Sequence, residues 1–386
     1  GVTRACEGTQ RHVTGGGKCN GGTLNTDRSG MSRQLDSATL NGVINSGNFV
    51  ANNSTTTTLV GTITNTGDIL LASIGNFTDL VSNDAVTLTG GATLSLQSAA
   101  RIVGSGTLFV GGSDGTPFTV QGAGNTSGNF GNNSLTIVNR TGGVITANNF
   151  NGNSDVILLV DPSPTGGLTN LGLMQASNGG ILRLTGNGGG GFANSGIIEA
   201  LDASQVQLTS GASISGGTLR TTGSGSIVNL DTATLTTLTN SGAFVANNNT
   251  TTTLIGTITN TGSISLNSVG KFTDLALSGN VTLQGGGVVN LTLADRIVGS
   301  GILTNVNNTI QGGLNSSGNF GNNSIGIVNQ SAGVISANVS GLAIRLDPSM
   351  TDGLPNTGMN QALNAGGGVH PRHQQDRGRA RGRRYV

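Results

Sequence analysis

The chain contains few of the residues that build metal centres and aromatic protein cores. Its 386 residues include no Trp, one Tyr, two Cys and three His, and only 9% are charged. Residues 37–369 hold no Cys and no His, which excludes thiol catalysis and Cys-based zinc sites from that segment. Disordered chains usually combine low hydrophobicity with high net charge, whereas this chain is 34% hydrophobic with a formal charge of +1.

The charge distribution argues against a nucleic-acid partner. Residues 37–369 hold 7 basic and 13 acidic residues, a net charge of −6, so the basic residues that offset them lie near the two ends. A nucleic-acid-binding protein would need a basic face on its folded body. The sequence also has no apolar run of transmembrane length and no recognisable export signal. Because the repeat pattern starts abruptly, we expect a fragment of a longer polypeptide that continues at both ends.

The main positive feature is a duplication with an offset of 195 residues. Residues 45–69 and 240–264 differ at only four of 25 positions. A shorter spacing of 20 residues separates Gly47 from Gly67 and Gly242 from Gly262. Repeats of this kind indicate one structural unit stacked on its neighbours.

The duplication divides the chain into three parts. We expect an irregular N-terminal stretch over residues 1–20 and a solenoid over residues 21–368. The solenoid comprises two homologous copies, at about residues 21–195 and 216–368. Residues 369–386 form a basic tail that is either disordered or the product of a frameshift, since a back-translation read one base later encodes a strand-like sequence.

Alternating apolar residues predict short strands with one inward face. We expect strands of about 4–6 residues, with the Asn-x-Gly glycines at positive φ where the chain turns. Short strands at a fixed spacing predict an all-β parallel β-solenoid with about 20 residues per coil, roughly 17 coils and a length of about 80 Å. The spacing also predicts side-chain amide ladders that join Asn45 to Asn65 and Asn240 to Asn260. A β-sandwich array is the alternative, but it would need longer repeats and more aromatic core residues.

The N-x-G-x-I-x-A/L pattern of residues 194–202, 240–246 and 260–266 resembles a bacterial protein family. These segments look like the repeats of filamentous-haemagglutinin-like adhesins and autotransporter passenger domains, and the resemblance covers roughly residues 21–368. It implies a right-handed, single-stranded parallel β-helix, export across a Gram-negative envelope, and a role in adhesion or surface structure. Host or environmental glycans and surface proteins are the partners that it implies.

Catalysis has a weak sequence basis. Residues 25–27 (Asn-Thr-Asp) match one element of pectinase-like β-helix enzymes, which need several facing carboxylates. The aligned residues 220–222 of the second copy are Arg-Thr-Thr, so Asp27 is not repeated and reads as a turn residue. We assign no catalytic, cofactor-binding or metal-binding residues and expect no enzyme activity and no cofactor.

Several charged residues recur in both copies. The pairs Asp79/Asp274 and Asp161/Asp347 suggest either Ca²⁺ binding between coils or, as we favour, Asp side chains that cap turns. Arg101 and Arg296 are expected either to pair locally or to stay solvated, with contact to acidic glycans as the alternative.

Other motifs have plain structural interpretations. The Gly-rich residues 186–191 lack the Lys-Ser/Thr of a phosphate-binding loop and predict a turn. The Thr runs at 55–58 and 250–253 occur once per copy, which disfavours an ice-binding array. Cys6 and Cys19 are candidates for a disulfide in an oxidising compartment.

We therefore expect a secreted or cell-surface rod, adhesive or structural, from a Gram-negative bacterium. A polysaccharide-degrading β-helix enzyme and a stalk or surface-layer protein without a receptor are the alternatives.

Overall fold

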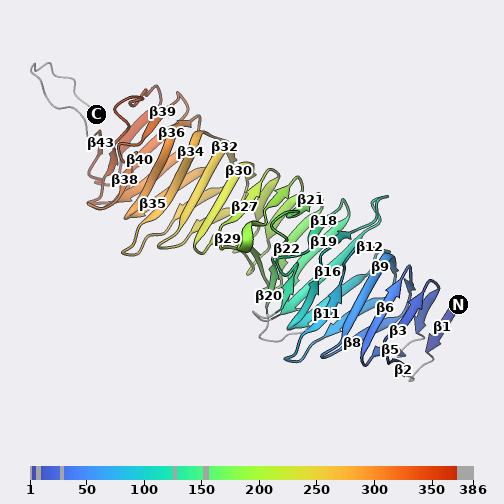
Figure 1. Ribbon diagram of the computed structural model, residues 1–386. Coiled ribbons are helices and arrows are strands. Elements are labelled where there is room, and N and C mark those ends of the chain that lie inside the picture. Colours follow the sequence, from blue (N-terminus) through green and yellow to red (C-terminus); the bar gives the residue numbers. More distant parts are fainter. Residues whose placement is uncertain (1, 6–9, 27–29, 125–127, 151–155, 372–386) are drawn as a thin grey trace, which may run out of the picture.

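The short strands stack into one parallel β-solenoid of about 15 turns, with about 23 residues per turn and essentially no helix (Figure 1). The computed structural model describes residues 2–5, 10–26, 30–124, 128–150 and 156–371. The first and last coils lie at opposite ends of a rod (Figure 1). At about 4.8 Å per coil the rod is on the order of 70 Å long. The all-β parallel solenoid predicted from the sequence is confirmed.

Each coil passes through three parallel sheets, which we name faces A, B and C in chain order. Face A contains β2 (Gln10–Val13), β5 (Met31–Gln34), β8 (Asn48–Asn52), β10 (Asp68–Ala72), β13 (Thr93–Ser98), β16 (Phe118–Gly124), β19 (Gly143–Asn148), β22 (Leu173–Ser177), β25 (Ile197–Ala200), β28 (Thr218–Thr221) and β39 (Ile325–Asn329).

Face B contains β3 (Gly17–Asn20), β6 (Ser37–Asn41), β11 (Thr78–Val81), β14 (Ala100–Val103), β17 (Asn129–Phe130), β20 (Ile157–Val160), β23 (Ile181–Thr185), β26 (Gln205–Thr209), β29 (Ser226–Asn229), β31 (Ala243–Ala246), β33 (Ser263–Leu266), β35 (Val288–Leu293), β37 (Thr309–Leu314), β40 (Val334–Ala337) and β42 (Met359–Ala362). Face C contains β1 (Val2–Ala5), β4 (Thr23–Thr26), β7 (Ile44–Asn45), β12 (Ala85–Thr89), β15 (Thr107–Val110), β18 (Thr136–Asn139), β21 (Leu168–Asn170), β24 (Phe192–Asn194), β27 (Ala212–Ser215), β38 (Asn319–Phe320), β41 (Ile344–Leu346) and β43 (Val369–Pro371).

Six strands exceed the expected 4–6 residues; β16 has seven, and the other five continue around a corner from one face to the next. β9 (Thr56–Asn65) runs from face B to face C, with Gly61 at a φ of 69° where it bends. The other four run from face C to face A: β30 (Thr232–Asn240), β32 (Thr251–Asn260), β34 (Thr273–Gln284) and β36 (Asp295–Asn305).

Inward side chains form continuous aliphatic stacks between the faces. On face A the in-register residues Phe49, Ile69, Leu94, Val120 and Ile145 are each 2% exposed or less. The stacks belong to one hydrophobic cluster that runs the length of the solenoid. Burial of apolar area at about 25 cal/mol per Å² is therefore the main force that holds coil to coil.

Buried amide ladders lie where strands end, because each ladder asparagine is the last residue of its strand. Asn45 Nδ2 donates to Asn65 Oδ1 at 2.6 Å, and Asn240 Nδ2 donates to Asn260 Oδ1 at 2.8 Å, which confirms both predicted ladders. A third ladder was not predicted, and it joins Asn139, Asn170 and Asn194 through 2.7 Å bonds. These amides are almost fully buried, so each bond spares a polar group the cost of burial without a partner.

The glycines of the Asn-x-Gly steps have a different role from the one predicted. Gly47, Gly67, Gly242 and Gly262 do not have positive φ. A Cβ on Gly67 would instead lie 2.3 Å from the carbonyl oxygen of Gly47, and one on Gly262 would lie 2.2 Å from that of Gly242. Glycine is required here because adjacent backbones approach too closely for any side chain.

The coils are longer than the 20-residue spacing predicted. The ladder pair Asn45–Asn65 spans 20 residues, but the pair Asn139–Asn170 spans 31 because the connections between the strands of its coil are longer. The mean is therefore about 23 residues, and the chain makes about 15 turns where we expected 17.

The two sequence copies do not lie on the same faces. From β8 the chain returns to face A seven times to reach β28, and an eighth return is made by the C-terminal half of β30. The next strand, β31, repeats the sequence of β8 but pairs with β29 on face B. The 195-residue duplication therefore spans eight and one-third coils, and each surface of the first copy reappears one face further around the rod.

Strand pairing is parallel throughout the described residues except at two single-residue antiparallel bridges, Gly124–Ile157 and Leu314–Ala343. Within residues 1–20, for which we expected irregular structure, β1, β2 and β3 pair with β4, β5 and β6 and continue the stack. At the other end β43 pairs with β41, and residues 372–386 lie outside the described residues.

Candidate functional site

The most exposed apolar surface that recurs in both copies is a corner loop. The loop at residues 73–77 joins β10 to β11, and its repeat at 268–272 joins β33 to β34. Ile74 is 82% exposed and Phe77 48%, and their counterparts Val269 and Phe272 are 75% and 46% exposed. Large side chains that stay in water at equivalent positions of both copies mark a candidate contact site.

The neighbouring coil holds the backbone of each loop in place. In the first copy the Asn53 side-chain oxygen accepts hydrogen bonds from the backbone N–H of Ile74 at 2.8 Å and of Asn76 at 3.2 Å. In the second copy Asn248 accepts from Val269 at 2.6 Å and Lys271 at 3.2 Å. Both loops therefore present their apolar side chains from a fixed backbone.

Beside each loop lies a cluster of one Phe, one Arg and one Asp, which we call the Phe–Arg–Asp cluster. Arg101 on β14 is the direct cross-coil neighbour of Asp79 on β11. Its Nε and Nη2 donate to the two carboxylate oxygens at 2.8 and 2.7 Å, and its guanidinium carbon lies 3.7 Å from the centre of the Phe77 ring. Two-pronged pairing and cation–π stacking fix the ring in place.

The second copy repeats this geometry closely. Arg296 donates to both oxygens of Asp274 at 2.7 and 2.6 Å and lies 3.9 Å from the centre of the Phe272 ring. The hydrogen bonds to Asp274 raise the pKa of Arg296. The first cluster lies on face B and the second on face C, so the two point in different directions.

These contacts decide between the sequence hypotheses for the repeated charges. Arg101 and Arg296 pair locally, as expected, with Asp79 and Asp274 as their partners. Those two aspartates therefore neither pair with another acid nor serve mainly as turn caps. The sequence contained the information to find the clusters, because Asp and Arg are 22 residues, or one coil, apart in both copies.

Asp161 and Asp347 occupy a second repeated site, at the corner after β20 on face B in the first copy and after β41 on face C in the second. Asp161 is 5% exposed and Asp347 is 8% exposed. The side-chain amide of Asn129 donates to Asp161 at 3.4 Å, and that of Asn319 donates to Asp347 at 3.1 Å. Burial raises the pKa of Asp161. Each carboxyl thus lies beside a neutral amide, and no second carboxyl among the described residues is hydrogen-bonded or paired with it.

Asp295 is a buried acid that only the second copy has, since Ala100 takes its place in the first. It is fully buried, and its oxygens accept the backbone N–H groups of Ser268 at 3.0 Å and of Thr292. Burial outweighs these hydrogen bonds and raises its pKa to about 6. Because Ser268 begins the second corner loop, this carboxyl holds the base of that loop. Asp295 was not among the residues singled out from the sequence.

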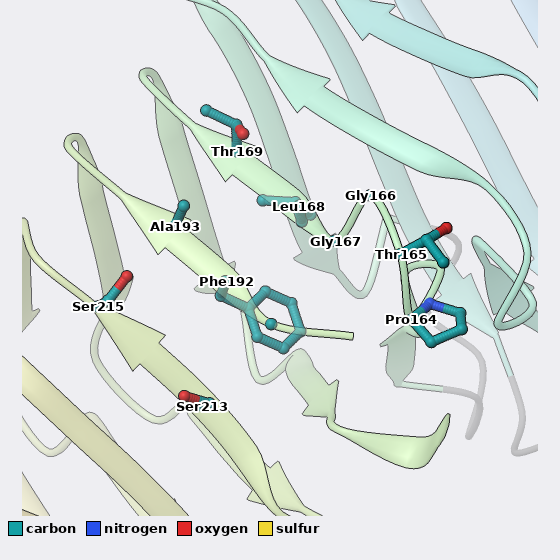
Figure 2. A pocket seen from close by; sticks show the side chains of 11 residues that line it. Pro164, Thr165, Gly166, Gly167, Leu168, Thr169, Phe192, Ala193, Ser213 and Ser215 are labelled. Atoms are coloured by element: carbon teal, nitrogen blue, oxygen red, sulfur yellow. The ribbon is translucent and has the colours of Figure 1, made fainter. Parts of the chain in front are cut away.

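A shallow pocket of about 280 Å³ lies on face C across β21, β24 and β27 (Figure 2). Thr169, Ala193 and Ser215 stand on its three neighbouring strands, and Phe192 lies below them (Figure 2). All of its lining residues are uncharged, so the pocket offers hydroxyl and apolar groups but no acid–base pair. Among the described residues, no three His, Cys, Asp or Glu side chains gather in a metal-binding arrangement.

The remaining sequence motifs have structural roles or lie outside the described part. Residues 186–191 form the turn between β23 and β24, with a short 3₁₀ turn at η1 (Asn187–Gly189). The Thr runs alternate: Thr57 and Thr252 are buried, and Thr57 donates to Gln34, so the runs make no flat outward array. Asp27 and Cys6 lie outside the described residues, and Cys19 is half-buried on β3.

Comparison with protein-family models, with curated proteins and with solved structures finds no match to this chain. Within the described residues, no helix has the length and apolar character needed to cross a membrane.

Proposed function

We propose that the chain is a non-enzymatic rod, secreted or displayed on the surface of a Gram-negative bacterium, that carries adhesive contact sites away from the cell. The observation that carries the proposal is the repetition of the corner loop and its Phe–Arg–Asp cluster in both copies, with Phe77 and Phe272 about half exposed. An exposed Phe makes no contribution to the core, so its presence in both copies favours a binding role over a packing role.

The chemistry of the site suits a weak partner contact. The Phe ring offers an apolar face, and the adjacent Arg–Asp pair offers hydrogen-bonding groups that are 15–26% exposed. Glycans and surface proteins both present such mixed apolar and polar surfaces. Since each site is small, useful affinity would come from several weak contacts along one rigid rod.

Binding of the purified chain to glycan arrays and to cell surfaces tests the proposal. The Phe77→Ser/Phe272→Ser double variant should lose at least tenfold in apparent affinity. Met350→Ser is the matched control, because Met350 is also exposed, at 83%, but lies away from both clusters. Circular dichroism should show the same β-sheet content in all three proteins.

Two results would count against the adhesive rod. No binding by the wild-type chain to any glycan or cell type would favour a stalk or surface-layer role. Release of reducing sugars from pectin or related polymers by the purified chain would favour the polysaccharide-degrading alternative.

A further inference from the structure

Face B from β26 to β42 is a long sheet surface without charge. Eight consecutive strands, β26, β29, β31, β33, β35, β37, β40 and β42, contain no Asp, Glu, Lys or Arg. The run begins one coil after Arg183 on β23, whose guanidinium bonds to Gln207. Charged side chains on a sheet surface oppose its association with another copy, and the strands of this run have none.

The outward side chains of this face form two ordered columns. In one, Asn290 donates to Ser265 at 3.0 Å and Gln311 donates to Asn290 at 3.0 Å, while Gln361 donates to Ser336 at 3.3 Å. The parallel column holds mostly β-branched and apolar residues, in the order Ser263, Val288, Thr309, Val334 and Met359. Hydrogen-bonded amide ladders beside aliphatic columns are the surface chemistry of packed sheet pairs.

An apolar rim lies along the same surface. Met359 on β42 is 53% exposed, and Leu293 at the end of β35 is 40% exposed. Val339 and Leu363, which follow β40 and β42, are 41% and 46% exposed. Four of the large exposed hydrophobic side chains thus border one sheet face, which favours a covered surface over a solvated one.

We propose that this surface, from β26 to β42 of face B, is an interface with the same face of a second copy of the chain. Neighbouring strands of the face are about 4.8 Å apart along the rod, and the strands of a second copy have the same spacing. Amide and aliphatic side chains of the two faces can therefore interdigitate at every strand. The absence of charge means that two identical faces meet without like-charge repulsion.

The area of the face fits a dimer. The face is eight strands long at about 4.8 Å per strand, and its two outward residues per strand make it roughly 13 Å wide. These dimensions give about 500 Å² on each partner, or about 1,000 Å² in total. That total is near the lower limit for a specific protein interface, so a dissociation constant in the micromolar range is expected. A two-fold arrangement places identical faces against each other and closes the assembly at two copies.

The other surfaces are less suited to this contact. The equivalent face of the first copy is face A, where the uncharged run covers only β13, β16, β19 and β22. Asp68 on β10 precedes that run, and the Glu199–Arg220 pair follows it. The strands of face C from β12 to β27 are also uncharged, but the Arg140 guanidinium lies over the Phe109 ring and the pocket hollows the surface across β21, β24 and β27. Face B from β26 to β42 is the uncharged run that carries both the amide column and the apolar rim.

Sedimentation equilibrium of the full chain, with matched variants, tests the proposal. Asn290→Lys places a cation near the middle of the interface, where two-fold symmetry brings it close to its equivalent, and should weaken the dimer at least tenfold. Ser95→Lys is the matched control, because Ser95 is the first-copy equivalent of Asn290 on face A. Circular dichroism should show that both variants keep the solenoid.

The proposal is supported if the wild-type chain forms a dimer that is weakened by Asn290→Lys but not by Ser95→Lys. It is overturned by a wild-type chain that stays monomeric up to millimolar concentration. It is equally overturned by a dimer that both variants weaken alike or that neither affects. The wild-type chain could also be monomeric but bind vesicles or glycans. If Asn290→Lys abolished that binding, the face would belong to another partner and the proposal would be overturned.

Discussion

Ionisation of Asp295 should make the second corner loop less stable at neutral pH than at pH 4. The folded-state pKa of about 6 lies above the ordinary value of 3.8, so the folded protein binds this proton more tightly than the unfolded chain does. Stability from the protonated form is complete below pH 4 and is lost as the pH rises through 6. A difference of about two pKa units corresponds to about 3 kcal/mol, larger than the ~1 kcal/mol of one hydrogen bond.

The Asp295→Asn variant isolates this effect. The amide keeps an acceptor for one of the two backbone N–H groups but cannot ionise, so any loss of hydrogen bonding is the same at each pH. Other carboxyl groups titrate alike in both proteins. The difference in opening free energy between variant and wild type should therefore change by about 3 kcal/mol between pH 4 and pH 7.5, in favour of the variant at high pH.

Hydrogen-exchange protection of residues 263–298 is the suitable measurement, because it reports local opening in a repeat protein that need not unfold as one unit. The expected change is roughly a hundredfold in relative protection factor across that pH range. Ala100→Asp at the equivalent position of the first copy should create a pH dependence of the same sign around residue 73. The reasoning is refuted if variant and wild type differ by the same amount at pH 4 and pH 7.5.

Two further pairs of substitutions test the packing between coils. In urea denaturation, Gly67→Ala should destabilise the fold by about 1–3 kcal/mol, because the new Cβ would lie 2.3 Å from the Gly47 carbonyl oxygen. Gly191→Ala is the control and should be nearly neutral, because the nearest atom to its new Cβ would be 3.8 Å away. Asn170→Ala removes the central amide of a fully buried ladder and should cost about 2–4 kcal/mol by the same assay, whereas Asn41→Ala, which breaks an exposed 3.3 Å amide bond, should cost under about 0.5 kcal/mol. Equal losses within either pair would contradict the role given to close approach or to buried amides.

The fold class could be predicted from the sequence because its signals are local. Alternating apolar residues define a strand face within five residues, and the 20-residue spacing of Gly47 and Gly67 reveals that units stack. The ladder of Asn45 and Asn65 followed from the same spacing, since equivalent residues of adjacent coils are in contact. The resemblance to bacterial surface proteins is a separate expectation about function, and the fold does not depend on it.

Tertiary structure alone determined which residues share a face. The face on which a residue lies depends on how many coils precede it, and the offset between paired residues of adjacent coils varies from 17 residues, between Ile227 and Phe244, to 31, between Asn139 and Asn170. Longer connections between strands change the number of coils that precede a residue without changing any strand pattern. For that reason the sequence showed that Phe77 and Phe272 are equivalent, but only the structure placed them on different faces of the rod and buried Asp295 where its twin is Ala100.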